Sequence, residues 1–452
     1  MPWGRSGERV RWLAVVVTCA TLTSGCLGPR PPKPLHEQYL AVWAGDADRK
    51  DSDFLALIDT DAESKTYGKV LRTIPVKSRG NEPHAVTPAL RDDRRLFATG
   101  ALSGRTFVFD LRQPLEGKLL RVDEPGEGRR FRTPLDVASL PSGGVVLACP
   151  DPLGFRGDAR EILTAPGGLV ELDANGQFRR EIPAVEPTAR GFIVAPTGVA
   201  VVPGEHALVV ASRAHGYVPT ATNERYPAIS VQMWRSDRLA PWRTVVLEAG
   251  PRGEENLGPD TTRAFHRQDL VYVATHDGGA LYASDSVGEK EPAFRLVFDF
   301  GAKALPSGAA VTPDDHWYVV ALPGAHRVAA LDVRDPWHPK MTSQVRLDRD
   351  PAGKARAGGP SGLAMSADGT RVAVSDYTVD LAGYRLDGDR RVHLLRLDPQ
   401  TGQLRVDAAF RDEISGEEGI DFNRGKWPHG ETGPARPHGV LFLAPAAPSD
   451  ED

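Results

Sequence analysis

The chain has 452 residues, which is enough for one large β-domain or for two to three ordinary domains. Its net charge of −5 comes from interspersed acids and bases, so no basic stripe indicates a nucleic-acid partner. Hydrophobic residues make up 40% of the chain, enough to bury a core, and its 46 glycines and 38 prolines favour many tight turns over a helical protein.

The N-terminal segment has the features of an export signal. Three arginines precede an apolar run at 13–22 that is too short to span a bilayer. Ser24 and Gly25 then stand directly before Cys26, which resembles a bacterial lipobox, although Thr23 occupies the third position before the cysteine. We therefore predict a signal peptide over residues 1–25 and lipidation of Cys26. An ordinary secretory signal and an uncleaved anchor are the alternatives.

The segments that flank the body predict an anchored protein. Residues 26–36 contain Gly-Pro-Arg-Pro-Pro-Lys-Pro, which favours a stiff, extended tether after the lipid attachment site. Residues 37–445 are predicted to fold as one domain, and residues 446–452 to form an acidic, disordered tail. Leu27 gives no signal for retention at an inner membrane. We thus expect a lipid-anchored protein of the bacterial cell envelope that faces the periplasm or the exterior; the outer membrane is one candidate for the anchor, and the sequence does not decide which membrane carries it.

Within the body, short apolar strands that end in Asp recur in place of any long helical period. Asn-Gly, Asp-Gly and similar polar turns follow several of them, as tight hairpins require. The spacing of these strands is typical of units of about 40–60 residues, the length of four-stranded propeller blades. We predict an all-β fold, a single β-propeller of about seven blades with four antiparallel strands each. An irregular pair of β-sandwiches is the alternative. The strands are 54–59, 105–110, 168–173, 295–299, 327–332 and 393–398.

Several longer stretches resemble the selenium-binding protein family, whose better-characterised enzymes are methanethiol oxidases. They are DFLALIDTDAESKTYGKV (53–70), GRTFVFDLRQP (104–114), GGLVELDANGQ (167–177), GPSGLAMSADGTRVAVSDY (359–377) and GIDFNRGKWPHGETGPARPHGVLF (419–442). The resemblance implies a β-propeller. For the enzymatic members it also implies copper held by histidines near the central channel, and oxidation of methanethiol by oxygen and water to formaldehyde, hydrogen sulfide and hydrogen peroxide.

The histidines of this chain depart from the family pattern. Relatives carry a histidine doublet after Asn-Glu-Pro, whereas here His84 is followed by Ala85, and the segments 132–144 and 359–365 lack the histidines expected there. A redox copper site needs several converging imidazole or sulfur ligands. The remaining weak candidates for metal ligands are His84, His276, His429 and His438.

Two of these candidates occupy a repeated Pro-His-Gly pattern, at 428–430 and 437–439. Since the last strand of a propeller usually closes the ring beside the first blade, both loops could lie near His84. Two structural turns are the alternative. The other histidines are expected in the tether (His36), in surface turns (His206, His266, His316 and His338) or on a strand facing solvent or core (His393).

Two functions remain open from the sequence. The first is a binding or scaffold propeller with a degenerate copper site, no resident cofactor, and a small molecule or a protein as partner at the channel mouth. The second is a copper-dependent methanethiol oxidase with rearranged ligands. The number of imidazoles that converge on the channel separates the two. The single body cysteine, Cys149, follows an apolar run and is expected to be a buried, inert thiol.

Overall fold

The computed structural model describes residues 37–90, 92–150, 167–186, 194–217, 225–347, 359–380 and 385–445. Residues 35–452 form one compact unit. The predicted signal peptide, Cys26, the tether and the acidic tail lie outside the described residues. Within the part that is described, no helix is long and apolar enough to cross a membrane.

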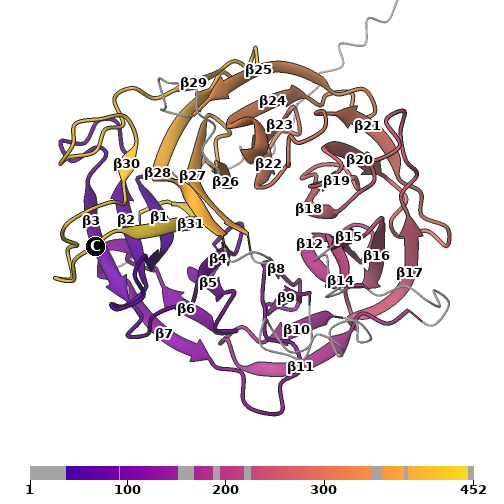
Figure 1. Cartoon of the computed structure of the whole chain (residues 1–452), viewed down its shortest axis with the longest axis horizontal. Helices are drawn as coiled ribbons and strands as arrows, with labels where there is room; N and C mark the ends of the chain where they lie inside the picture. The colour runs from indigo at the N-terminus through magenta and orange to yellow at the C-terminus, as the bar shows by residue number, and fades with distance from the viewer. Residues whose placement is uncertain are drawn as a thin grey trace, which may run out of the picture. The chain divides into compact units, whose positions relative to one another are not determined.

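The strands form seven antiparallel sheets arranged in a ring, as Figure 1 shows face-on, and the innermost strands line a central channel. From the channel outward, the first blade has β31 (Ala435–Leu443), β1 (Tyr39–Asp46), β2 (Phe54–Asp59) and β3 (Val70–Pro75). The second has β4 (Pro83–Val86), β5 (Arg95–Gly100), β6 (Thr106–Asp110) and β7 (Lys118–Asp123). The third has β8 (Asp136–Ser139), β9 (Val145–Cys149), β10 (Gly168–Leu172) and β11 (Phe178–Pro183).

The remaining blades repeat this order. The fourth has β12 (Pro196–Val202), β13 (Ala207–Ser212), β16 (Ser230–Arg235) and β17 (Ala240–Val246). The fifth has β18 (Pro259–Ala264), β19 (Val271–Thr275), β20 (Ala280–Ser284) and β21 (Arg295–Asp299). The sixth has β22 (Ala309–Val311), β23 (Trp317–Leu322), β24 (Arg327–Asp332) and β25 (Lys340–Arg346). The seventh has β26 (Pro360–Met365), β27 (Arg371–Asp380), β28 (Arg385–Leu397) and β29 (Leu404–Val406), and β30 (Ile420–Asp421) pairs with β28. The predicted seven-bladed propeller is confirmed.

The C-terminal strand closes the ring. β31 pairs antiparallel with β1, from Tyr39 opposite Leu443 to Asp46 opposite Ala435, and so supplies the innermost strand of the first blade. This joins the two ends of the folded body through one sheet, and it leaves no unpaired edge between the last blade and the first.

The Asp that ends the recurring strands has a local structural role. Asp59, Asp110 and Asp332 each end the third strand of a blade and accept a hydrogen bond from the backbone N–H two residues later. This side-chain turn begins the hairpin to the fourth strand. The fifth blade departs from this pattern, because Asp299 ends the fourth strand and Ser284 ends the third. There, Ser284 replaces the carboxylate in accepting the turn N–H.

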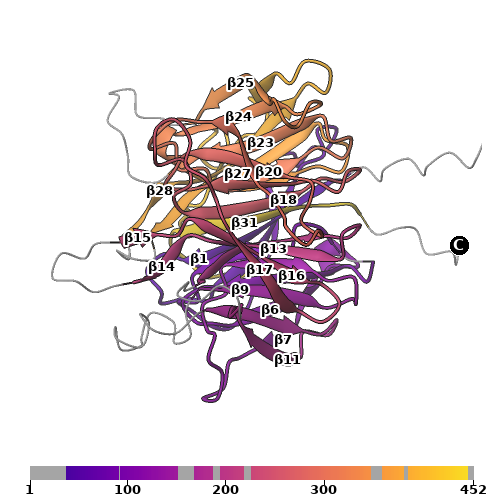
Figure 2. The same ribbon diagram turned by 90° about the vertical axis from the view of Figure 1, so that its right-hand side faces the viewer.

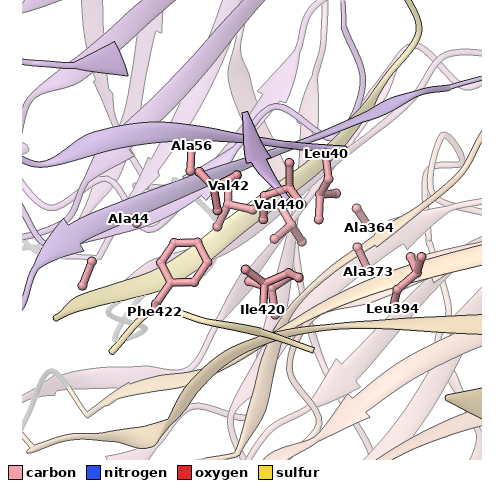
Figure 3. Close-up of a cluster of buried hydrophobic side chains, with 14 of the residues drawn as sticks. Leu40, Val42, Ala44, Ala56, Ala364, Ala373, Leu394, Ile420, Phe422 and Val440 are labelled. Atoms are coloured by element: carbon pink, nitrogen blue, oxygen red, sulfur yellow. The ribbon is translucent and has the colours of Figure 1, made fainter. Parts of the chain in front are cut away.

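Apolar side chains between neighbouring blades form the core. Figure 3 shows the cluster where the first and seventh blades meet, in which Val42, Val440, Ile420 and Leu394 pack together. All four are at most 5% exposed. Each fully buried side chain of this size contributes about 1.5–3 kcal/mol relative to leaving it in water. Similar clusters lie at the other interfaces, so the ring is held together between its blades.

A proline lies at or within three residues of the start of every innermost strand. The seven prolines are Pro83, Pro134, Pro196, Pro259, Pro306, Pro360 and Pro437. All seven inner strands run in the same direction along the channel, so the prolines lie at one end of it, which we call the mouth. The hairpin β14 (Ala214–Tyr217) and β15 (Arg225–Pro227), which connects β13 to β16, extends from the ring at this end (Figure 2).

The described body begins and ends at the opposite end of the channel. The side chain of Glu37 accepts a hydrogen bond from the N–H of Ala367, in the loop that follows β26. Glu37 and Ala444 both line this end of the cavity.

Candidate functional site

The channel encloses a cavity of about 1190 Å³ that residues of all seven inner strands line. The residue after each of the seven prolines lies at the mouth and contributes to the lining. We call these residues the mouth ring: His84, Leu135, Thr197, Asp260, Ser307, Ser361 and His438. Six of the seven are polar, and hydrogen bonds join some of them, such as the one between the hydroxyls of Ser307 and Ser361 at 3.1 Å.

Farther along the inner strands the lining is mostly apolar. Val86, Val137, Val199, Leu363 and Val440 contribute to it from five different blades. The cavity therefore combines a polar entrance with an apolar interior, which is the usual composition of a small-molecule site.

Glycines bring the inner strands close together at the mouth. A Cβ on Gly362 would lie 2.0 Å from the carbonyl oxygen of His438, and one on Gly439 would lie 2.8 Å from that of His84. In each case the neighbour is the mouth-ring residue of the next blade. Side chains at these positions would push the blades apart, so the glycines fix the width of the ring.

Two imidazoles of the mouth ring stack on each other. The rings of His84 and His438 have centroids 4.4 Å apart and planes inclined by 25°. Nδ1 of His84 lies 2.7 Å from the carbonyl oxygen of Leu135, and Nδ1 of His438 lies 2.9 Å from that of His84. Because a carbonyl can only accept, each Nδ1 carries the proton and each Nε2 keeps a lone pair.

The environment keeps both rings neutral. Burial, with a smaller effect from the charge of Arg213, lowers the pKa of His84 to about 4. Burial, and then the neighbouring His84, lower the pKa of His438 to about 3. At neutral pH both Nε2 atoms are therefore acceptors, suited to a hydrogen-bond donor or a metal.

The third candidate, His276, lines the same cavity from the other side. It follows β19 in the fifth blade, three blades away from the stacked pair in either direction, and is 5% exposed. Its Nδ1 lies 3.1 Å from the carbonyl oxygen of Pro306. Among the described residues, only one group of three or more His, Cys, Asp or Glu has ligand atoms within 4.8 Å of one another, and it contains none of these imidazoles.

The structure places the fourth candidate, His429, away from the channel. Its Nδ1 lies 2.6 Å from Oγ1 of Thr73, and its Nε2 lies 2.9 Å from a carboxylate oxygen of Glu431. Its ring also contacts Phe54, so it packs against the outer strands of the first blade. The hypothesis that both Pro-His-Gly segments could lie near His84 therefore fails for 428–430, where the alternative of a structural turn holds, because only 437–439 belongs to an inner strand.

A network of buried charged side chains beside the mouth was not predicted from the sequence. Glu82, directly before β4, is 2% exposed and has a left-handed φ of 56°. Its carboxylate accepts hydrogen bonds from Tyr377, Arg436 and Arg49 at 2.8, 2.8 and 3.1 Å. The network joins the first, second and seventh blades next to His84. The only sequence signal was a charged residue in the loop that leads into Pro83.

The remaining predictions for single residues agree with the structure. Cys149 is buried at 1% exposure, and His393 is in the core at 3%. The four histidines expected in surface turns are exposed, and His266 also lines the channel at the end opposite the mouth.

Comparisons with known proteins connect this geometry to a family. No protein-family model matches the chain. Over 91 residues the chain is 40% identical to a methanethiol oxidase of Hyphomicrobium sp, a match that covers 19% of this chain and about a fifth, 20%, of that relative. The fold is similar to that of a hypothetical selenium-binding protein from Sulfolobus tokodaii, with a TM-score of 0.71 and 19% identity over 93% of this chain and 96% of the other. The predicted family resemblance is confirmed.

Other solved structures share the fold under different names. A putative 6-phosphogluconolactonase from Bacteroides fragilis has a TM-score of 0.55 and 11% identity over 90% of this chain and 98% of its own. A fold that occurs under such different names does not by itself define an activity, so the function has to be argued from the mouth.

Proposed function

We propose that the chain is a selenium-binding-protein-like lipoprotein of the cell envelope that binds a small molecule in its channel and carries a degenerate copper site. The observation that supports this most strongly is the stacked pair His84 and His438, with both Nδ1 atoms committed to backbone carbonyls. The alternative is a copper-dependent methanethiol oxidase.

The stacking argues against a copper centre built on this pair. A metal bonds an imidazole nitrogen in the plane of the ring, at about 2.0–2.1 Å. Two rings inclined by only 25° with centroids 4.4 Å apart direct their lone pairs side by side, not toward a common point. With His276 on the far side of the channel, the donor set does not fit a resident redox copper ion.

The mouth ring suits the polar end of a neutral ligand. Two Nε2 acceptors share this ring with the hydroxyls of Thr197, Ser307 and Ser361 and the carboxylate of Asp260, which line the same cavity from other blades. The valines and leucine farther in would contact an apolar body, and the cavity of about 1190 Å³ can enclose one. These features favour a small molecule with hydrogen-bond donors at one end over a protein partner.

Copper loading of the full chain separates the proposal from its alternative. After aerobic incubation with Cu²⁺ and dialysis, elemental analysis should find much less than one copper per chain, with no difference between wild type and His84→Ala. One bound copper that disappears in His84→Ala but not in His429→Ala, together with hydrogen peroxide released from methanethiol, would favour the oxidase.

Ligand binding can be tested with short-chain alcohols, amides and thiols as probes. In the full chain they should raise the melting temperature, and His438→Phe should remove the rise because it keeps the stacked ring but deletes the acceptor. His429→Phe is the matched control and should respond like wild type. A rise that survives in His438→Phe would place the ligand elsewhere.

The anchoring prediction has its own test. Cys26→Ala should move the chain from the membrane fraction to the soluble one in a bacterial host that lipidates it. A soluble wild-type chain would indicate an ordinary secretory signal, and a variant that stays with the membrane would indicate an uncleaved anchor.

A further inference from the structure

A second cluster of ligand-type side chains lies in the seventh blade, outside the channel site. Asp376 is on β27, and Asp389 and His393 are on β28. One ligand atom from each lies within 4.8 Å of the other two. Asp376 and His393 are 4% and 3% exposed. Because Asp376 pairs with Arg391, and His393 follows two residues later, both side chains are on the same face of the sheet.

The atoms that face each other in this cluster are not hydrogen-bonded. Nε2 of His393 and Oδ2 of Asp389 are buried, and neither has a hydrogen-bond partner among the described residues. They are 3.8 Å apart, which is too far for a hydrogen bond. Burying a nitrogen and a carboxylate oxygen without hydrogen-bond partners lowers the stability of a fold, so we expect a bound group between these two atoms.

The distance between the two atoms fits a shared metal ion. Two ligands that each lie about 2.0–2.2 Å from a tetrahedral zinc ion are roughly 3–4 Å from each other. Arg391, on the same face, donates its guanidinium hydrogens to the carboxylates of Glu417 and Asp421. Its charge therefore already has acidic partners outside the cluster.

The surroundings hold the two ligands in position. Oδ1 of Asp389 accepts the N–H of Arg391 at 3.0 Å, which orients the other oxygen. A Cβ on Gly419 would lie 2.9 Å from Nδ1 of His393, so the imidazole is packed directly against that glycine. Positioning of this kind around the ligands is typical of metal sites.

We propose that Asp376, Asp389 and His393 bind a divalent transition-metal ion of the zinc type. One imidazole and two carboxylates are a ligand set that zinc accepts, and together they neutralise its charge. The ion would join β27 to β28 at the base of the hairpin that extends past the mouth. The site is structural and independent of the function proposed for the channel.

The test uses the full chain, stripped of metal with a chelator and titrated with Zn²⁺ under calorimetry. Wild type should bind one Zn²⁺, and Asp389→Asn, which keeps the size of the side chain, should weaken the affinity roughly a hundredfold. Co²⁺ as a probe should give the visible absorption of a tetrahedral site in wild type and lose it in the variant. The double variant His84→Ala/His438→Ala should bind Zn²⁺ as wild type does.

Two results would overturn the proposal. One is that wild type binds no Zn²⁺, and the other is that Asp389→Asn binds it with wild-type affinity. If Asp389→Asn does not give the far-ultraviolet circular dichroism of the wild type, His393→Gln provides the second variant with the same expectations. Loss of binding only in the channel variant would assign the metal to the mouth and would count against the seventh-blade site.

Discussion

The segments 428–430 and 437–439 have the same sequence, Pro-His-Gly, yet they serve different parts of the molecule. His438 belongs to the mouth ring and stacks on His84. His429 packs on Phe54 and hydrogen-bonds Thr73 and Glu431 in the outer part of the first blade. Identical local chemistry thus has two roles, and the position of the segment within the blade repeat decides which.

The same contrast extends to the neighbours of the two segments. Arg436, directly before the second segment, is buried and binds Glu82 across the blade interface, whereas Lys426, the basic residue nearest before the first segment, is exposed. Gly439 packs against the next inner strand, whereas a side chain at Gly430 would meet no neighbour within 4 Å. The two glycines occupy equivalent positions, and the two basic residues provide a buried and an exposed charge for comparison.

The largest difference should come from the charges. Arg436→Met leaves Glu82 buried with fewer partners, and we expect it to lower the free energy of unfolding by about 3–5 kcal/mol. Lys426→Met should change it by less than about 0.5 kcal/mol. Urea denaturation followed by tryptophan fluorescence measures both. Equal changes in the free energy of unfolding for Arg436→Met and Lys426→Met would contradict this difference between the two segments.

The glycines should give the next largest difference. Gly439→Ala places a methyl group 2.8 Å from the carbonyl oxygen of His84 and from Val86, and we expect a loss of about 1–3 kcal/mol. Gly430→Ala meets no neighbour, but the glycine has φ +99°, so only backbone strain of about 1 kcal/mol is expected. Crystal structures of both variants should show displaced strands only for Gly439→Ala.

Acid should destabilise the mouth through its histidines. Their folded pKa values of about 4 and about 3 lie below the unfolded value of about 6.5, so the unfolded chain binds more protons between these limits. Their contribution is complete above pH 6.5 and is lost as the pH falls toward 4, at up to about 1.4 kcal/mol per pH unit for each histidine. His84→Phe/His438→Phe should flatten this part of the stability curve. Ser361→Ala, which removes no titratable group, should keep the wild-type slope.

The smallest effect should come from His429 itself. His429→Ala removes hydrogen bonds to Thr73 and Glu431 and should cost about 1 kcal/mol, while the binding of channel ligands stays unchanged. His438→Ala should abolish that binding. Calorimetric titration of both variants with one probe from the thermal screen checks the pair, and loss of binding in His429→Ala would contradict the separation.

The fold could be predicted from the sequence because each repeat is specified by interactions between residues that are close in the chain. An apolar strand that ends in Asp, followed by a turn, reflects a hydrogen bond within two residues, and such signals survive in the sequence. The pattern changes at Asp299, which ends a fourth strand, and Ser284 performs the turn function one strand earlier. The prolines near the starts of the inner strands form a second repeat in the sequence, but Pro428 precedes His429 just as Pro437 precedes His438, so this repeat does not separate the two histidines.

The rest of the site depends on contacts that no local pattern encodes. Tyr377 reaches Glu82 across 295 positions of the chain, and Arg436 does so across 354. The seventh-blade cluster needs the pairing of β27 with β28 before Asp376 and His393 can be placed on one face. Alternation along the strand predicted that His393 faces either the core or solvent. It could not predict which side chains the imidazole contacts.

The positions of Glu37 and Ala444 indicate how the channel would be oriented relative to a bilayer. Both lie at the end of the channel away from His84 and His438. If Cys26 carries lipid, the ten residues that separate it from Glu37 would span at most roughly 35 Å when fully extended. The lipid would then be attached at the end of the channel opposite the mouth. The mouth, with His84 and His438, would face away from the membrane, and a ligand would enter from the aqueous phase and not from the bilayer.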